Sequence, residues 1–147
     1  MKPLNSSLEA ALSYLNHHAC SERQLIQKLK DAGFAEAAIE ESLSQAKKWN
    51  YVDDRKFGES RIHQLKARMK SRAFVFHDLE SHGVSKEMTR ELMDAYYPEE
   101  SELEIAAALI RKKATPGKSK IKVSVYLVRN GFSENTVRQC LPSIDPT

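Results

Sequence analysis

Apolar and polar positions along the chain follow the same pattern three times. In the first copy an apolar residue, Leu29, lies four positions before Gly33, and another, Phe34, follows that glycine directly. The same arrangement recurs around Gly83 and Gly131, so that the three glycines lie 50 and 48 residues apart. A fixed period of this length predicts a helical repeat.

Each of these glycines is expected to end a helix. Glycine adopts the left-handed conformation at little cost, and the apolar residues four before and one after it then occupy the two positions that touch in a Schellman motif. The pairs expected in contact are Leu29 with Phe34, Leu79 with Val84, and Leu127 with Phe132. Ser85 and Ser133 suit the N-cap of the helix that follows the glycine, whereas Ala35 is a poorer cap.

A further helix is expected before each pair. Leu8, Leu12 and Leu15 follow helical spacing, and residues 57–69 and 103–110 carry a similar apolar stripe. The expected caps are Ser21 with Gln24 as a capping box before the first glycine turn, Asp53 and Asp54 for the first helix of the second repeat, and Ser101 for that of the third.

These elements predict an all-α fold in which three tandem three-helix repeats form an elongated, curved helical solenoid. The expected repeats are residues 4–50, 51–97 and 98–147, within a single repeat domain that covers 1–147. The composition agrees, since 41% hydrophobic and 29% charged residues are typical of a globular chain, and 5 glycines and 5 prolines leave few turns for a sheet. At this length we expect either one ordinary domain or several small units that share one core.

The chain carries no pattern of export or membrane insertion. No apolar segment follows Lys2, and no run approaches the ~18 apolar residues of a membrane span. Cys20 and Cys140 lie far apart in sequence and are expected to be reduced packing residues. We therefore expect a cytoplasmic monomer that does not contact a membrane.

No motif indicates an enzyme, a cofactor or a metal. The sequence has no glycine-rich phosphate loop, zinc spacing or nucleophile signature. His17, His18 and Cys20 come nearest to a metal cluster, but consecutive side chains on a helix diverge by about 100°, so a polar helix end is the favoured interpretation. Asp53 and Asp54 also diverge, and we interpret them as caps rather than as an acid–base pair.

Two features suit nucleic-acid contact but have a plainer interpretation. Trp49 and Tyr51 could stack on a base, although packing in the core at the joint between two repeats is favoured. A helix, a glycine turn and a helix are also the outline of a helix-turn-helix reader. The helix after the first turn carries Glu36, Glu40 and Glu41, which phosphates would repel, so sequence-specific DNA reading is disfavoured.

Positive charge is concentrated in two segments, although the net charge is only +3. Residues 60–77 and 105–133 contain several cations and no carboxylate. Both segments run from the end of the first helix of a repeat into its second, so a regular stack would bring them to related places on one surface. The candidate binding residues are Arg61, Lys66, Arg68, Lys70 and Arg72 in the first segment, and Arg111, Lys112, Lys113, Lys118, Lys120 and Lys122 in the second. They could line a groove for a polyanion or an acidic protein partner, or simply form a solvated face.

Three stretches resemble the family of the bacterial regulatory protein RecX. They are SERQLIQKLKDAGF at residues 21–34, WNYVDDRKFGESRI at 49–62 and LESHGVS at 79–85. The order and spacing of these stretches carry the resemblance, which runs from about residue 4 to 141. The sequence differs from the usual family pattern at Asn50, Gly58, Ser71 and Asp78, and it has Phe74 and Phe76 at positions that are commonly basic in the family.

The resemblance implies both a fold and a function. The fold would be three tandem three-helix repeats. The function would be binding of the RecA recombinase in the groove of its filament on DNA, with suppression of ATP hydrolysis, strand exchange and co-protease activity, and without a cofactor. Several family members also bind single- or double-stranded DNA. Two other classes stay open: a nucleic-acid-binding helical protein without a recombinase partner, and a neutral helical scaffold.

Overall fold

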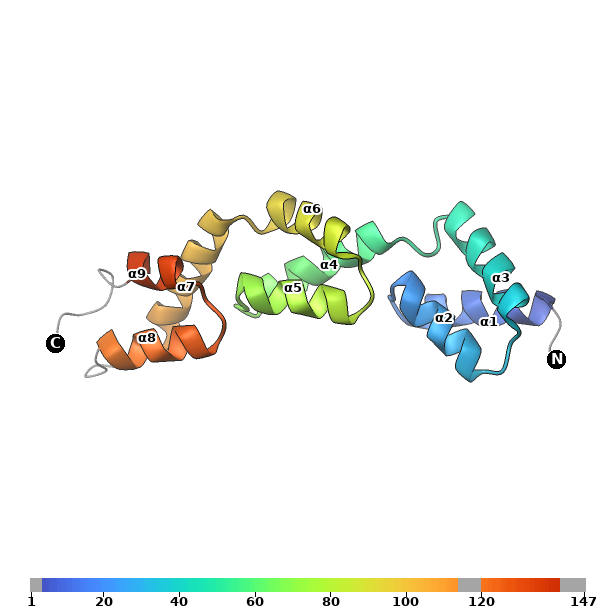
Figure 1. Cartoon of the computed structure of the whole chain (residues 1–147), viewed down its shortest axis with the longest axis horizontal. Helices are drawn as coiled ribbons and strands as arrows, with labels where there is room; N and C mark the ends of the chain where they lie inside the picture. Colours follow the sequence, from blue (N-terminus) through green and yellow to red (C-terminus); the bar gives the residue numbers. More distant parts are fainter. Residues whose placement is uncertain (1–3, 114–119, 141–147) are drawn as a thin grey trace.

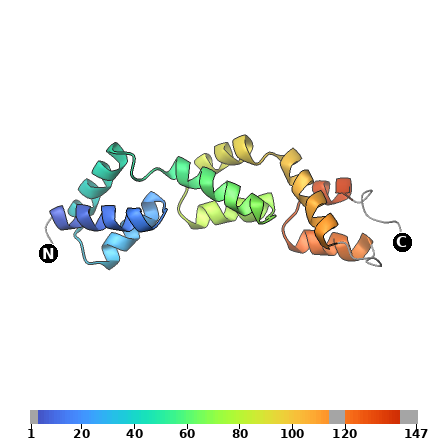
Figure 2. The same ribbon diagram turned by 180° about the vertical axis from the view of Figure 1, so that it is seen from behind.

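A computed structural model describes residues 4–113 and 120–140 of the chain. The described part is entirely helical and lacks strands. Its helices are α1 (Leu4–His17), α2 (Glu22–Asp31), α3 (Glu36–Lys48), α4 (Asp54–Ala67), α5 (Arg72–Ser81), α6 (Lys86–Tyr96), α7 (Glu99–Lys113), α8 (Lys120–Arg129) and α9 (Glu134–Cys140). They lie in three groups of three along an elongated row, with α1 near one end and α9 near the other (Figures 1 and 2). This is the all-α repeat architecture that the periodic pattern predicts.

Each group of helices closes its own apolar core instead of contributing to a shared one. Leu25, Leu29 and Ile39 are buried in the first core, Ile62, Val75, Leu79 and Leu92 in the second, and Ala106, Leu127 and Val137 in the third. The expectation of one shared core is therefore wrong for the described residues. Neighbouring groups contact each other through individual side chains. Met69, for example, follows α4 of the second group and packs against the core of the third group.

The three glycines end helices as predicted. Gly33, Gly83 and Gly131 have φ of 91°, 97° and 87°. The amide of the residue after each glycine donates to the carbonyl oxygen of the residue four positions before that glycine. The N–O distances are 3.2 Å for Phe34 to Leu29, 3.1 Å for Val84 to Leu79 and 3.1 Å for Phe132 to Leu127. These hydrogen bonds define the Schellman motif, so the glycine register of the sequence is confirmed.

Two further helices end in the same way without a glycine. Asn50 after α3 and Met69 after α4 have φ of 60° and 59°. The amide of Tyr51 donates to the Ala46 carbonyl at 2.8 Å, and that of Lys70 donates to the Leu65 carbonyl at 3.0 Å. The sequence pattern missed these endings because it marked left-handed positions only by glycine.

Most of the expected caps are present. Ser21 and Gln24 form the capping box, the Ser85 and Ser133 hydroxyls accept from amides three residues later, and Ala35 makes no side-chain cap. Ser101 does not cap a helix, because α7 begins earlier, at Glu99, and the Pro98 carbonyl accepts from the amide of Ser101. Asp53 caps α4 by accepting from the amides of Arg55 and Lys56.

Asp54 has a different role from the expected cap of α4, because it reaches back to the preceding repeat. Its Oδ1 accepts from the amide of Glu22, the first residue of α2, at 2.8 Å. Glu102 of the third repeat repeats this contact, since its Oε2 accepts from the amide of Arg72, the first residue of α5, at 2.8 Å. A carboxylate of one repeat therefore caps the second helix of the repeat before it.

The glycine turns take part in the same two joints. A Cβ on Gly83 would lie 2.5 Å from the Cβ of Arg23 in α2, and a Cβ on Gly131 would lie 2.7 Å from the Ser71 hydroxyl before α5. The Ser21 hydroxyl also donates to the carbonyl of His82, beside Gly83. The turn of each later repeat thus packs on the N-terminus of the preceding repeat's second helix.

Within the described residues, none of the helices combines the length and the apolar character needed to cross a bilayer.

Candidate functional site

Three of the five candidate cations in the middle repeat are used inside that repeat. The Arg61 guanidinium of α4 makes two hydrogen bonds to the Asp78 carboxylate of α5, at 2.7 Å from Nε and 2.9 Å from the second nitrogen. Burial of Asp78 opposes its ionisation, but the hydrogen bonds and charge of Arg61 outweigh burial, so the pKa of Asp78 is lowered. Arg61 therefore joins α4 to α5.

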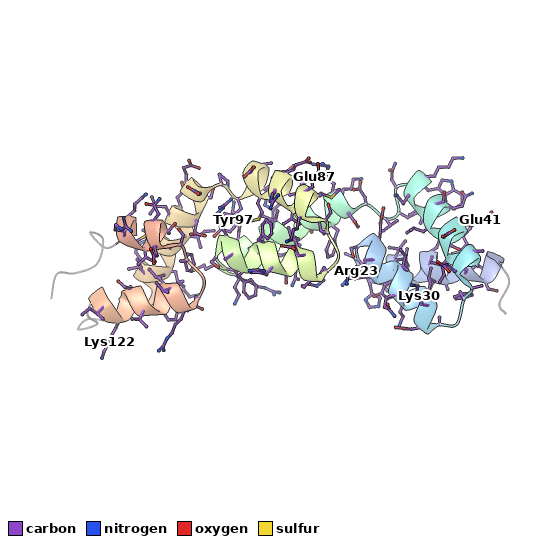
Figure 3. All side chains as sticks on the ribbon, viewed as in Figure 1. Arg23, Lys30, Glu41, Glu87, Tyr97 and Lys122 are labelled. Atoms are coloured by element: carbon purple, nitrogen blue, oxygen red, sulfur yellow. The ribbon has the colours of Figure 1, made fainter. Side chains whose placement is uncertain are left out.

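Lys66 and Arg72 hold the end of α6. The Lys66 ammonium donates to the Tyr96 carbonyl at 2.8 Å and lies 5.3 Å from the centroid of the Tyr97 ring. Arg72 Nε donates to the Tyr97 carbonyl at 2.7 Å. Tyr97 itself is fully buried in the middle repeat (Figure 3). The two cations donate to carbonyls at the C-terminus of α6, where a helix runs out of its own backbone donors.

The other two cations of this segment lie at a cleft between the second and third repeats. The α4–α5 turn and α5 form one wall of the cleft, which has a volume of 720 Å³, and α7, α8 and the Gly131 turn form the other. Arg68 and Lys70 line the first wall, and Lys112 lines the second. The cleft thus brings together cations from both basic segments.

Arg129 of α8 also lines this cleft, together with two exposed aromatic side chains. Phe74 of α5 is 43% exposed and Tyr126 of α8 is 39% exposed. We call Arg68, Lys70, Phe74, Lys112, Tyr126 and Arg129 the basic cleft. Neither Phe74 nor Tyr126 was predicted as a site residue from the sequence. For Phe74, the sequence offered one indication: it stands where the resembled family commonly has a basic residue.

The charge of the basic cleft is positive only. Among the described residues that line it there is no Asp or Glu. A separate cleft of 340 Å³ contains Glu99 and Glu102 and shares only Ala73, His77 and Gly131 with it. A one-sign cleft concentrates ligands of opposite charge, so the basic cleft favours an anionic ligand.

Among the remaining candidate cations, Arg111 and Lys122 do not line the cleft. Arg111 is an exposed residue of α7, and Lys122 projects outward from α8 (Figure 3). Lys113 is the last residue of α7 and Lys120 the first of α8. Lys118 lies outside the described residues.

A more polar cleft of 430 Å³ lies between the first and second repeats. His18, Cys20, Asp53 and His82 are among its lining residues. Burial, with a smaller contribution from the charge of Asp54, raises the pKa of the Cys20 thiol to about 11, so the thiol is protonated at neutral pH and is a poor nucleophile or metal ligand. Across the described residues, no three His, Cys, Asp or Glu side chains come together as metal ligands.

Trp49 and Tyr51 do not pack in a core, so the favoured interpretation of these residues was wrong. Trp49 is 48% exposed and Tyr51 is 60% exposed, and their rings meet edge-on with centroids 6.1 Å apart. Asn50, between the two rings, is in the left-handed conformation, and Tyr51 lines the cleft between the first and second repeats.

Comparison with known proteins finds related chains. A family model described as the first three-helix domain of RecX matches residues 8–45. A regulatory protein RecX from Caldanaerobacter subterraneus subsp. tengcongensis is 31% identical over 131 residues, which cover 89% of this chain and 66% of that protein. Others are 26% identical in Bacillus licheniformis, covering 97% of this chain and 56% of that protein, and 28% identical in Syntrophotalea carbinolica, covering 95% and 96%. The chain therefore spans about two thirds of the first relative's length and 56% of the second's.

Two solved structures have a similar fold. The crystal structure of RecX from Lactobacillus salivarius matches with a TM-score of 0.85 at 17% identity, covering 97% of this chain and 96% of that one. A crystal structure of a regulatory protein RecX matches with a TM-score of 0.77 at 19% identity, covering 93% of this chain and 70% of that one. At these identities the likeness shows a common helical repeat architecture.

Proposed function

The chain belongs to the RecX family of regulatory proteins, and from this premise we propose that it docks on a RecA filament on DNA and inhibits the filament's ATPase, strand-exchange and co-protease activities. It acts by binding, without catalysis of its own. The observation that carries the proposal is the basic cleft, which gathers Arg68, Lys70, Lys112 and Arg129 from two repeats.

An elongated row of small units supports this mode of action. Each repeat has its own core and offers separate surfaces, so one chain spans more of a long partner than a compact domain of equal mass would. A cationic cleft in such a row suits an anionic filament surface, either the phosphates of its DNA or a carboxylate patch of its protein.

The proposal is tested by measuring ATP hydrolysis of RecA filaments assembled on DNA before this protein is added. We expect the wild-type chain to slow hydrolysis. Reversal of the four cations (Arg68→Glu, Lys70→Glu, Lys112→Glu and Arg129→Glu) should raise the concentration needed for half-inhibition on the order of tenfold or more, because attraction at the contact becomes repulsion.

A matched control changes the net charge equally at exposed cations outside the cleft, with Lys30→Glu, Lys48→Glu, Lys86→Glu and Arg90→Glu. This control should inhibit like the wild type. Equal loss in both quadruple variants would show that net charge matters and the basic cleft does not. Hydrolysis unaffected by the wild-type chain would contradict docking on the filament.

The basic cleft also favours a second candidate function, that of a nucleic-acid-binding protein without a recombinase partner. Such a protein lowers hydrolysis only by competing for bare DNA, so it acts when added before the recombinase and not when added to finished filaments. The order of addition separates the two functions.

A further inference from the structure

Both joints between repeats are made by the same two surfaces. One is the glycine turn of the later repeat, and the other is the start of the second helix of the earlier repeat. A Cβ on Gly83 would lie 2.5 Å from the Cβ of Arg23, and a Cβ on Gly131 would lie 3.7 Å from the Cβ of Ala73. Arg23 and Ala73 each stand ten residues before the glycine of their own repeat, so the two joints use equivalent positions.

In the third repeat this position is exposed. Ile121 stands ten residues before Gly131, and its side chain is 76% exposed. Val125, one turn later on the same side of α8, is 42% exposed, whereas its equivalent in α5, His77, lines both clefts of the second joint. Scattered exposed apolar side chains are ordinary, but these two occupy positions that a neighbouring repeat covers elsewhere in the chain. The start of α8 is therefore a joint surface that no repeat covers among the described residues.

The first repeat has the complementary surface uncovered. A Cβ on Gly33 would have no atom within 4 Å, in contrast to Gly83 and Gly131. The α2–α3 turn, which contains Gly33, lies at one end of the row, and the start of α8 lies at the other (Figure 1). The two uncovered surfaces of one molecule are thus too far apart to meet each other, and they can meet only between two molecules.

We propose that copies of this chain join head to tail, with the Gly33 turn of one molecule (the head) packed on Ile121 and Val125 at the start of α8 of the next (the tail). This contact repeats between molecules the joint that the chain makes twice within itself. It is heterologous, so it extends the row of repeats and does not stop at a dimer. A chain that joins in this way is not the monomer expected from the sequence, and its association does not depend on docking to a filament.

Charges at the head and the tail are opposite. Asp31 and Glu36 lie on either side of Gly33 and are exposed. Lys122 and Arg129 are exposed residues of α8, a helix without a carboxylate. Opposite charge favours the approach of a head to a tail, and it opposes the pairing of two α8 helices with each other. A second copy in head-to-tail order is therefore the occupant that fits the exposed face of α8.

One element of the internal joints is missing from this contact. Asp54 and Glu102 each stand 29 residues before the glycine of their own repeat, and each caps the second helix of the repeat before it. The first repeat has Leu4 at this position, so the contact between molecules lacks the carboxylate cap. The partner is also not tethered by the chain. We therefore expect weak association that depends on concentration.

Sedimentation of the full chain, without recombinase or DNA, tests the proposal. The weight-average mass should rise above that of one chain as the concentration increases from about 1 µM to about 1 mM. Ile121→Glu replaces the most exposed apolar side chain of the tail by a charge. Gly33→Asn keeps a residue that tolerates the left-handed conformation and adds a side chain for which the single molecule has open space, but which the head-to-tail contact would exclude, as the joint does at Gly83. Each variant should weaken association about tenfold or more.

A mixture of the two variants identifies the order of the contact. Ile121→Glu molecules keep an intact head and Gly33→Asn molecules keep an intact tail, so the mixture should form one-to-one dimers and no larger species. Trp49→Glu makes a similar change at an exposed side chain in neither surface and should associate like the wild type. Thermal melting checks that each variant is folded.

Three results would overturn the proposal: a mass that stays that of one chain up to about 1 mM, association unchanged in both single variants, or dimers formed by Gly33→Asn alone and lost in Ile121→Glu, which would indicate symmetric pairing of two α8 helices. Inhibition of preassembled filaments is measured separately. Its failure would leave the head-to-tail contact intact, and a chain that stays monomeric would leave the filament proposal intact.

Discussion

At the residue scale, the Arg61–Asp78 pair shows that a cation in a basic segment can belong to the interior of its own repeat. In the sequence Arg61 lies in a segment of cations without a carboxylate. Asp78 is seventeen residues away, outside that segment, so the sequence gives no sign that the two residues pair. In the structure Asp78 lies one helix away, with its side chain only 12% exposed, and it binds Arg61 through both oxygens. Charge patterning therefore could not distinguish Arg61 from Arg68, which lines the cleft.

Asp78→Asn should destabilise the protein in a pH-dependent way. The pKa of Asp78 is lowered in the folded state, so its ionised form stabilises the fold above its ordinary pKa of about 4, and this contribution is lost as the pH falls through the lower folded pKa. We expect a loss of about 1–3 kcal/mol in the free energy of unfolding at pH 7 and a smaller loss at pH 3.

Urea unfolding followed by circular dichroism at the two pH values measures this difference. Asp94→Asn, at an exposed carboxyl of α6, is the control and should have little effect at either pH. An Asp78→Asn penalty that is the same at pH 7 and pH 3 would contradict the role of the ionised carboxylate.

At the scale of elements, the glycine turns both end helices and join repeats. Gly33 lies in the first repeat, and a Cβ there would have no atom within 4 Å. Gly83 has the same left-handed backbone, but a Cβ there would lie 2.5 Å from the Cβ and 2.7 Å from the Cδ of Arg23 in the preceding repeat. One sequence motif therefore has two structural roles.

Gly33→Ala and Gly83→Ala should differ in cost. Each places alanine at positive φ, which costs about 1 kcal/mol or somewhat more. Gly83→Ala must in addition displace the start of α2, so its loss should exceed that of Gly33→Ala by about 1 kcal/mol or more. Urea unfolding midpoints of the two variants give the comparison. Equal losses of stability would mean that the start of α2 can move away from residue 83 without a cost in the free energy of unfolding.

The first helices of the repeats show how far local pattern reaches. Their apolar stripes predict α4 and α7. Ser101 has the residue type of a cap and was predicted to be one, but α7 begins at Glu99, and the Pro98 carbonyl accepts the first hydrogen bonds of this helix. Asp54 looks like a cap for its own helix and instead caps α2 of the repeat before it. Cap assignments within a repeat were largely predictable, and those across a joint were not, because they depend on how two repeats meet.

At the scale of the whole molecule, the repeats form a row of separate cores linked by narrow joints (Figure 1). The second joint lies beside the basic cleft, whose two walls belong to different repeats. The geometry of the cleft therefore depends on the angle between the second and third repeats, which the Glu102 hydrogen bonds to Arg72 and Ser133 help to fix.

Binding of single-stranded oligothymidylate should depend on salt in proportion to the cations of the cleft. If the four cations each neutralise one phosphate, the logarithm of affinity should fall with the logarithm of salt concentration at a slope of about −3. Lys112→Ala should make the slope shallower by about 0.7, whereas Lys30→Ala, outside the cleft, should not change it. Titrations between about 50 and 200 mM salt measure the slopes. A wild-type slope near zero would exclude phosphate contact.

The sequence by itself determined the helices, the glycine register and the three-part repeat, because periodic apolar spacing and left-handed glycines act over one or two turns of chain. It also marked the two segments where positive charge gathers. Only the tertiary structure decided that the cores are separate, that Trp49 and Tyr51 are exposed, and that Arg61, Lys66 and Arg72 serve the middle repeat while Arg68, Lys70 and Lys112 share a cleft. Those outcomes depend on contacts between residues about twenty to sixty positions apart. The angle at which two repeats pack cannot be predicted from the spacing of residues within one helix or turn.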